Sequence, residues 1–150
     1  MRVALAEARR AGAREEIPVG AVVAVDGRIV ARAGNASVRS HDPTGHAEIR
    51  ALRRAAKRLG TYRLTEATLV VTLEPCLMCM GAMVHARIRR LVFGANDPKA
   101  GAAVSLYNVA DDRRLNHRFE VRGGLAADEC GSLLRAFFAS RRARSLSSRS

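Results

Sequence analysis

The sequence predicts an α/β domain in which a mixed sheet of about five strands lies between helices on both faces, a three-layer α/β/α arrangement. Segments whose apolar residues recur at helical spacing alternate with short apolar runs typical of buried strands. Two such runs flank Asp26-Gly27, which favours a tight turn between antiparallel strands. A length of 150 residues with 48% hydrophobic content suits one domain with a real core.

The expected elements alternate along the chain and end in a polar tail. In order they are a helix over 2–13, strands over 17–25 and 28–33, a helix over 46–56, a strand over 67–73, a helix over 77–86, strands over 89–94 and 118–121, and a helix over 125–141. Residues 143–150 are rich in Arg and Ser, and we expect this basic tail to be disordered.

A set of metal-binding side chains stands out at two places in the chain. His46 begins a helical run, and Cys76 and Cys79 stand three apart directly after the strand 67–73, at the edge of the sheet where α/β proteins bind ligands. If Pro75 opens a helix, both sulfurs point off one face of its first turn, where the thiolate form is favoured. Three ligands without a fourth are typical of a catalytic zinc, which keeps one position for water.

Glu48 stands two residues after His46, close enough to act near a metal without binding it. His-x-Glu followed by Pro-Cys-x-x-Cys is the signature of zinc nucleobase deaminases, in which the glutamate moves protons. Alternatively, the cysteines are small buried residues near a helix start and His46 is a hydrogen-bonded core histidine. That interpretation requires several independent coincidences of residue type and spacing.

The basic composition indicates a polyanionic partner. The formal net charge is +12 and the sequence pI is near 11.3, which favours nucleic acid, although an Arg-rich composition can also reflect a GC-rich genome. The clusters to consider are Arg50/Arg53/Arg54/Lys57/Arg58, Arg87/Arg89/Arg90 and Arg141/Arg142/Arg144.

The cysteines and the apolar segments bear on location. With Cys76 and Cys79 assigned to a metal and Cys130 far downstream, no pair remains for a disulfide framework, which predicts a reducing compartment, the cytoplasm. No segment is long and apolar enough to predict a signal peptide or a membrane span.

Segments flanking the zinc motif resemble one family over nearly the whole chain. They include Pro18-Val19-Gly20-Ala21-Val22, His41-Asp42-Pro43-Thr44, Thr72-Leu73-Glu74-Pro75-Cys76-Leu77-Met78-Cys79 and Asn116-His117. The chain is similar to bacterial tRNA-specific adenosine deaminases of the cytidine deaminase-like superfamily, whose mechanism is a general example of zinc-dependent base deamination. The resemblance implies the cytidine deaminase-like fold, with residues 1–142 as a zinc-dependent deaminase domain.

The same resemblance implies a reaction, a cofactor and partners. One Zn2+ per subunit, held by His46, Cys76 and Cys79, would activate water, and Glu48 would transfer protons while adenosine becomes inosine. The expected substrate is a tRNA anticodon stem-loop with adenosine at the wobble position, and the expected assembly is a homodimer. The residues expected to contact the substrate are Asn35, Val19, Ala47, Glu74, Pro75 and Asp97.

Departures from the family pattern, and two other function classes, leave substrate choice open. The departures are Gly45, Asn96, Val104 and Asn108, and Val104 replaces a glycine that could adopt left-handed conformations. A small-molecule deaminase acting on guanine or cytosine would use the same zinc site without needing the positive charge. A non-catalytic, zinc-stabilised RNA-binding module would need a fourth ligand, for which Cys130 and His85 are the candidates.

Overall fold

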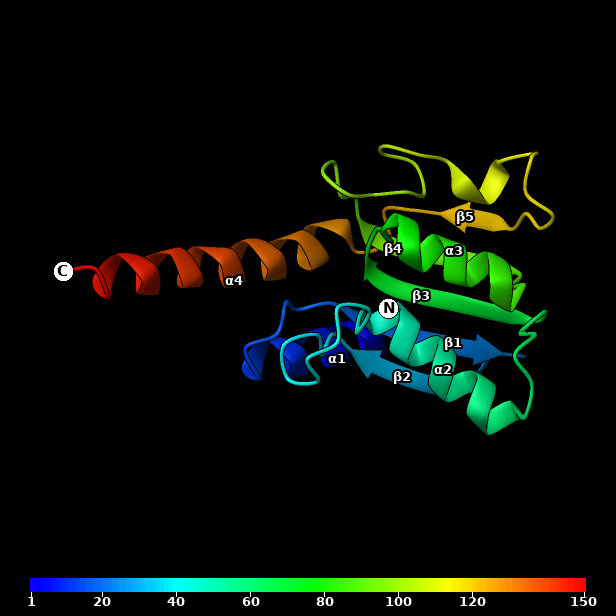
Figure 1. Ribbon diagram of the computed structural model, residues 1–150, viewed down its shortest axis with the longest axis horizontal. Coiled ribbons are helices and arrows are strands. Elements are labelled where there is room, and N and C mark those ends of the chain that lie inside the picture. The colour runs from blue at the N-terminus through cyan, green and yellow to red at the C-terminus, as the bar shows by residue number, and fades with distance from the viewer.

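Helices and strands alternate along the chain, as the hydrophobic pattern predicts (Figure 1). A computed structural model describes residues 1–150. Its elements are α1 (Arg2–Ala13), β1 (Gly20–Val25), β2 (Arg28–Gly34), α2 (Ala47–Leu59), β3 (Ala67–Leu73), α3 (Leu77–Ala86), β4 (Arg90–Ala95), a 3-10 turn η1 (Val109–Asp111), β5 (Glu120–Arg122) and α4 (Ala127–Ser147).

The five strands form one mixed sheet in the order β2-β1-β3-β4-β5. The pairs β1–β2 and β1–β3 are antiparallel, whereas β3–β4 and β4–β5 are parallel. The predicted hairpin is confirmed, and its turn residues Asp26 and Gly27 both have positive φ, which matches the right-handed twist of the strands. The expected strand start at residue 17 is wrong: Val19 N–H donates to the Ile17 carbonyl in a turn, and pairing begins at Gly20.

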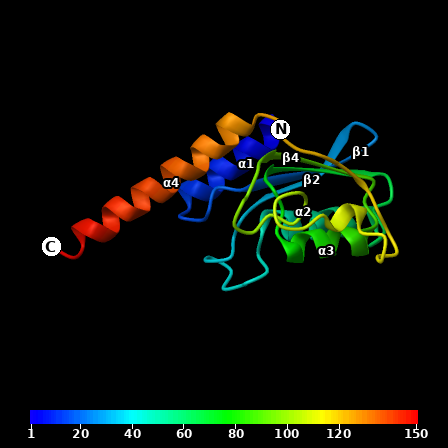
Figure 2. The same ribbon diagram turned by 90° about the horizontal axis from the view of Figure 1, so that it is seen from above.

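Helices cover both faces of the sheet, which confirms the three-layer α/β/α class (Figure 2). Helices α1 and α4 lie on one face and α2 and α3 on the other. Helix α1 buries small residues, Ala4, Ala8 and Ala11, and so approaches the sheet closely. A Cβ on Gly20 would stand 1.9 Å from the Ala4 carbonyl oxygen, so only glycine allows this approach.

Helix α4 continues past the predicted end near residue 141 and extends away from the sheet (Figure 1). The prediction of a disordered tail is therefore wrong for residues 143–147, and the expected domain boundary at 142 falls inside this helix. Ala, Arg and Leu favour helix and no Gly or Pro interrupts them. Glu15 fixes part of the extension, because its carbonyl accepts from Arg141 at 2.8 Å and its carboxylate pairs with Arg144 at 3.1 Å.

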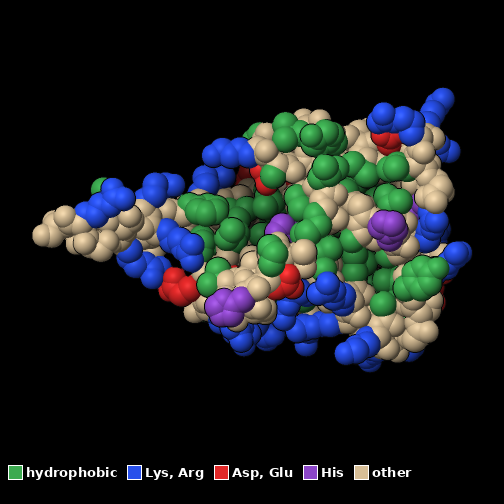
Figure 3. Space-filling view, in the orientation of Figure 1, with side chains coloured by type: hydrophobic (Ala, Val, Ile, Leu, Met, Phe, Trp, Pro, Cys, Tyr) green, Lys and Arg blue, Asp and Glu red, His purple; other side chains and the backbone are tan.

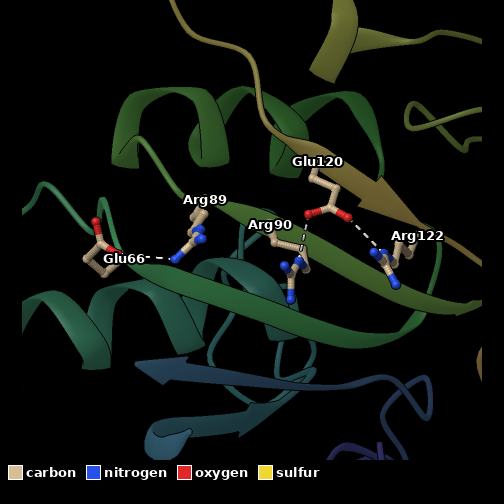
Figure 4. A network of polar contacts seen from close by, with 5 residues as sticks. All are labelled: Glu66, Arg89, Arg90, Glu120 and Arg122. Atoms are coloured by element: carbon tan, nitrogen blue, oxygen red, sulfur yellow. Dashed lines mark hydrogen bonds and ion pairs between the residues drawn. The ribbon is translucent and has the colours of Figure 1, made fainter. Parts of the chain in front are cut away.

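Exposed ion pairs connect the short strand β5 with its neighbour β4 (Figure 4). Glu120 accepts from Arg90 on β4 and from Arg122 on β5, both at 2.8 Å, while Arg89 pairs with Glu66 at 3.4 Å. Such exposed pairs contribute little each, so their effect is to favour one cross-strand arrangement. No helix of the protein combines the length and apolar content that crossing a bilayer requires.

Candidate active site

The starts of two helices bring the predicted metal ligands together. His46 is the N-cap of α2 and Cys76 is the N-cap of α3, while Cys79 lies in the first turn of α3. Pro75 precedes this N-cap, which corrects the expectation that Pro75 opens the helix. His46 Nδ1 lies 3.6 Å from Cys76 Sγ and 3.5 Å from Cys79 Sγ.

These three side chains fit a zinc ion. Their ligand atoms all lie within 4.8 Å of one another, and thiolate with imidazole is a donor set that zinc prefers. Zn–S and Zn–N bonds of about 2.3 and 2.05 Å at tetrahedral angles would separate nitrogen from sulfur by about 3.6 Å, which agrees with the observed distances.

No fourth protein ligand completes the cluster, as a closed structural site would require. The group of neighbouring ligand atoms contains His46, Cys76 and Cys79 alone. His85 is exposed in the last turn of α3, and the buried Cys130 packs against Gly94. The cluster therefore has the three-ligand form of a catalytic site, not of a structural zinc site.

Hydrogen bonding among the ligands prepares a thiolate. Hydrogen bonds from Cys79 and then from His46 lower the pKa of Cys76 to about 4, against the opposing effect of burial. The bond to Cys76 also keeps the proton on Cys79 and raises the pKa of that thiol, and it raises the pKa of His46. A divalent cation that displaced the Cys79 proton would gain a second thiolate.

Glu48 lies in the first turn of α2, two residues from the His46 ligand, and only 4% of it is exposed. Burial raises the pKa of its carboxyl group above the ordinary value. A carboxyl group whose pKa is shifted toward neutrality can both take and return a proton, so Glu48 has the properties of a general acid and base.

A hollow of about 180 Å³ opens over these groups. Its wall includes His46, Cys76, Glu48 and Glu74 together with three of the predicted substrate residues, Asn35, Val19 and Asp97. The Asn35 N–H donates to the Val19 carbonyl at 3.0 Å, which joins two sides of the wall. We call this hollow the active-site pocket.

Two predicted contact residues do not line the active-site pocket, and three unpredicted residues do. Ala47 is fully buried in the core, and the carbonyl of the buried Pro75 accepts from Ala102 N–H at 2.8 Å. Their expected roles in substrate contact gain no support from these positions. Ile17, Leu73 and Ala100 complete the wall. The position of Ile17 beside Pro18 was a signal in the sequence, but nothing local to Ala100 connects it with the metal ligands.

Glu74 holds the loop that covers one side of the pocket. Oε2 accepts the N–H groups of Ala103, Val104 and Ser105 at 2.9–3.2 Å, and Oε1 accepts Asp97 N–H at 3.0 Å and the Ser105 hydroxyl. Burial would raise the pKa of Glu74, but the hydrogen bonds from Ser105, Val104 and Asp97 together lower it. Its carboxylate is thus committed to the loop, and this position favours a structural role over the predicted substrate contact.

The departures from the family pattern gather in two loops around the pocket. Val104 does not have positive φ, so its β-branched side chain is accommodated, and its backbone belongs to the Glu74 loop. Asn96 Nδ2 also approaches Glu74 Oε1, at 3.5 Å, whereas Asn108 precedes η1. A Cβ on Gly45 would stand 3.1 Å from the Asp42 carbonyl oxygen, so glycine relieves a tight loop before His46.

The three-layer fold, the His-Cys-Cys cluster and the buried glutamate beside it define a nucleobase deaminase of the cytidine deaminase-like class. The family model described as MafB19-like deaminase matches residues 1–142. A tRNA-specific adenosine deaminase of Haemophilus influenzae is 52% identical over 143 residues, which are 95% of this chain and 83% of that protein. The chain therefore belongs to the family of tRNA-specific adenosine deaminases.

Solved structures agree with this assignment. One, from a study of A-to-I editing by tRNA deaminases at the wobble position of transfer RNA, has a TM-score of 0.87 and 48% identity, covering 89% of this chain and 97% of that chain. A guanine deaminase from Nitrosomonas europaea has a TM-score of 0.80 but only 26% identity, covering 92% of this chain and 82% of that chain. The guanine-type relative is thus more distant in sequence, although it shares the fold.

Proposed function

We propose that this protein catalyses the zinc-dependent hydrolysis of adenosine to inosine at the wobble position of a tRNA anticodon loop. The observation that carries the proposal is the buried Glu48 carboxyl group beside three converging metal ligands at the floor of one pocket. The family membership supports adenosine in tRNA as the substrate.

The side chains divide the chemistry between them. Zinc held by His46, Cys76 and Cys79 would supply a nucleophilic water near neutral pH. Glu48 accepts a proton from that water, passes it to N1 of the adenine ring as the water oxygen adds at C6, and assists the departure of the amino group as ammonia. Asn35, Val19 and Asp97, in the pocket wall, are positioned to hold the extruded nucleotide.

An anticodon loop suits this pocket because the reacting base must leave the stack. Bases in single-stranded loops are already partly splayed, so extrusion costs less than from a duplex. The net charge of +12 favours a polyanionic substrate over a free base. The proposal includes a cytoplasmic location, where the thiols of the cluster stay reduced.

The proposal also includes a homodimer. Leu77, Tyr107 and Leu115 are 39–54% exposed and line a hollow of about 650 Å³ beside α3, directly after the Cys76 ligand. A second copy of the chain is the occupant that the family membership favours. Light scattering on the purified protein should give the mass of a dimer, and the mass of a monomer at micromolar concentration would contradict this part.

The test compares substrates in parallel. Zinc-loaded protein is incubated with an anticodon stem-loop that carries adenosine at the wobble position, and separately with adenosine, guanine and cytosine, with Glu48→Gln as the inactive control. We expect inosine in the stem-loop alone. Turnover of guanine or cytosine with the stem-loop unchanged would instead favour the small-molecule deaminase, and equal behaviour of wild type and Glu48→Gln would contradict catalysis at this site.

A further inference from the structure

A second hollow, of about 250 Å³, adjoins the active-site pocket, and arginines form most of its wall. They come from α1, β2, the loop before α2, and α2 itself: Arg10, Arg14, Arg32, Arg39, Arg50 and Arg54. Asn35 lines both hollows, so the two are continuous. Figure 3 shows Lys and Arg side chains gathered along the margin of the molecule over α2 and β2. We call this hollow the arginine groove.

The positive charge of the groove is poorly compensated. Glu7 is the one carboxylate in its wall, and it pairs with Arg10 at 3.1 Å and Arg32 at 3.7 Å. The guanidinium groups of Arg14 and Arg39 form no ion pair. Like charges held this close repel one another, and an anion bound between them would relieve that repulsion.

Two of the guanidinium groups are fixed in position before any ligand binds. Arg50 Nη1 donates to the Gly34 carbonyl, and Arg54 Nη1 donates to the Arg32 carbonyl at 2.6 Å. Burial first, and then the charges of Arg54 and Arg39, lower the pKa of Arg50. Each guanidinium has five N–H donors, so these bonds leave others free in a geometry that matches phosphate oxygens.

The charged track extends beyond a single anion site. Another hollow, of about 480 Å³, shares Arg32 and Arg54 with the groove and adds Arg58. The track therefore starts at Asn35 in the pocket wall and follows β2 and α2 away from it. Of the basic cluster predicted on α2, Arg53 instead faces Asp42, 3.8 Å away. A row of guanidinium groups leading out of a nucleotide pocket suits successive phosphates of one strand.

We propose that the arginine groove binds the phosphodiester backbone of the RNA strand that continues from the nucleotide in the active-site pocket. This inference rests on the proposed function, because it takes RNA as the substrate. The groove would fix the strand while the wall around Asn35 holds the extruded nucleotide, so that affinity and choice of base are controlled by separate side chains.

The test removes two exposed groove arginines that have no ion-pair partner, in the variant Arg14→Gln/Arg39→Gln. The matched control, Arg2→Gln/Arg113→Gln, removes the same charge from two exposed residues that form no ion pair and lie outside the groove. Binding of a labelled stem-loop with inosine at the wobble position is measured by fluorescence anisotropy on zinc-loaded protein at several salt concentrations. The product base prevents turnover during the titration.

The salt dependence gives the expected result. Each lost phosphate contact lowers the slope of log affinity against log salt by about 0.7, so the groove variant should lose about sevenfold less affinity than wild type between about 50 and 200 mM salt. The control should keep the wild-type slope. A wild-type slope in the groove variant, or an equal reduction in the control, would overturn the proposal. If wild type leaves adenosine in a stem-loop unconverted, the proposed function fails, while the groove is still decided by the slopes.

Discussion

Replacing Glu74 with glutamine would change little in shape but would remove the charge that holds the loop over the pocket. If the glutamine carbonyl takes the place of Oε2, it can still accept the N–H groups of Ala103, Val104 and Ser105. Its amide group then faces Asp97 N–H, which now meets another donor. One buried donor without a partner costs about 1–3 kcal/mol, and the remaining bonds lose their charge assistance.

We therefore expect Glu74→Gln to destabilise the protein by about 3 kcal/mol. For a chain of this size, that corresponds to a fall in Tm of about 6–12 °C, measured by calorimetry on the zinc-loaded protein. The control is Glu66→Gln, the same chemical change at an exposed carboxylate whose partner is Arg89 at 3.4 Å. It should change stability by no more than about 0.5 kcal/mol.

The same variant should lose activity, because the loop carries Asp97 and Ala100 into the pocket wall. A displacement of about 1 Å of groups that position a substrate can cost about a hundredfold in rate. We expect kcat/KM on the stem-loop to fall by about this factor at a temperature where the variant is folded, with its zinc content unchanged. A Tm and kcat/KM equal to those of wild type would refute the assignment of Glu74 as the residue that holds the loop.

The remaining predictions concern the cluster and the fold. Glu48→Gln should keep its zinc and lose about 10²–10⁴ in kcat, because proton transfer contributes about this much; wild-type turnover would exclude Glu48 as the proton carrier. Cys79→Ser should lose zinc, measured by metal analysis of the purified protein, and full occupancy would contradict the assigned ligand set. Gly20→Ala should lower Tm by about 6–12 °C, since overpacking costs about 1–3 kcal/mol or more and its Cβ would meet Ala4 O at 1.9 Å. An unchanged Tm would mean that α1 moves away from the sheet without cost.

The ligands and the proton carrier could be predicted because their chemistry depends on short local spacings. His46 and Glu48 share one helix start, and Cys76 and Cys79 share another, so each half of the site is specified within a few residues. The hairpin turn and the alternation of elements depend on equally local patterns. What the sequence did not specify was the exact helix start, one residue after Cys76, although the sulfurs point to the same metal position for either start.

The pocket wall could not be predicted in the same way, because segments far apart in sequence form it. The course of the Glu74 loop depends on hydrogen bonds between residues about thirty positions apart, and no periodicity reports such bonds. The length of α4 was missed for a different reason. Its last residues are polar and exposed, as in a disordered segment, but they favour helix and Arg141 and Arg144 contact Glu15.

Reaction type and substrate choice therefore depend on different parts of the molecule. The cluster sits where the N-termini of α2 and α3 converge, and packing of both helices on one face of the sheet fixes that point. Changes in the loops can alter the wall without moving the ligands. Gly45 and Val104 lie in these loops and are compatible with the backbone there, so their influence must act through the shape of the surface and not through strain. A chain that kept the helix starts but lost the arginine groove should keep the deamination chemistry and lose affinity for polynucleotides.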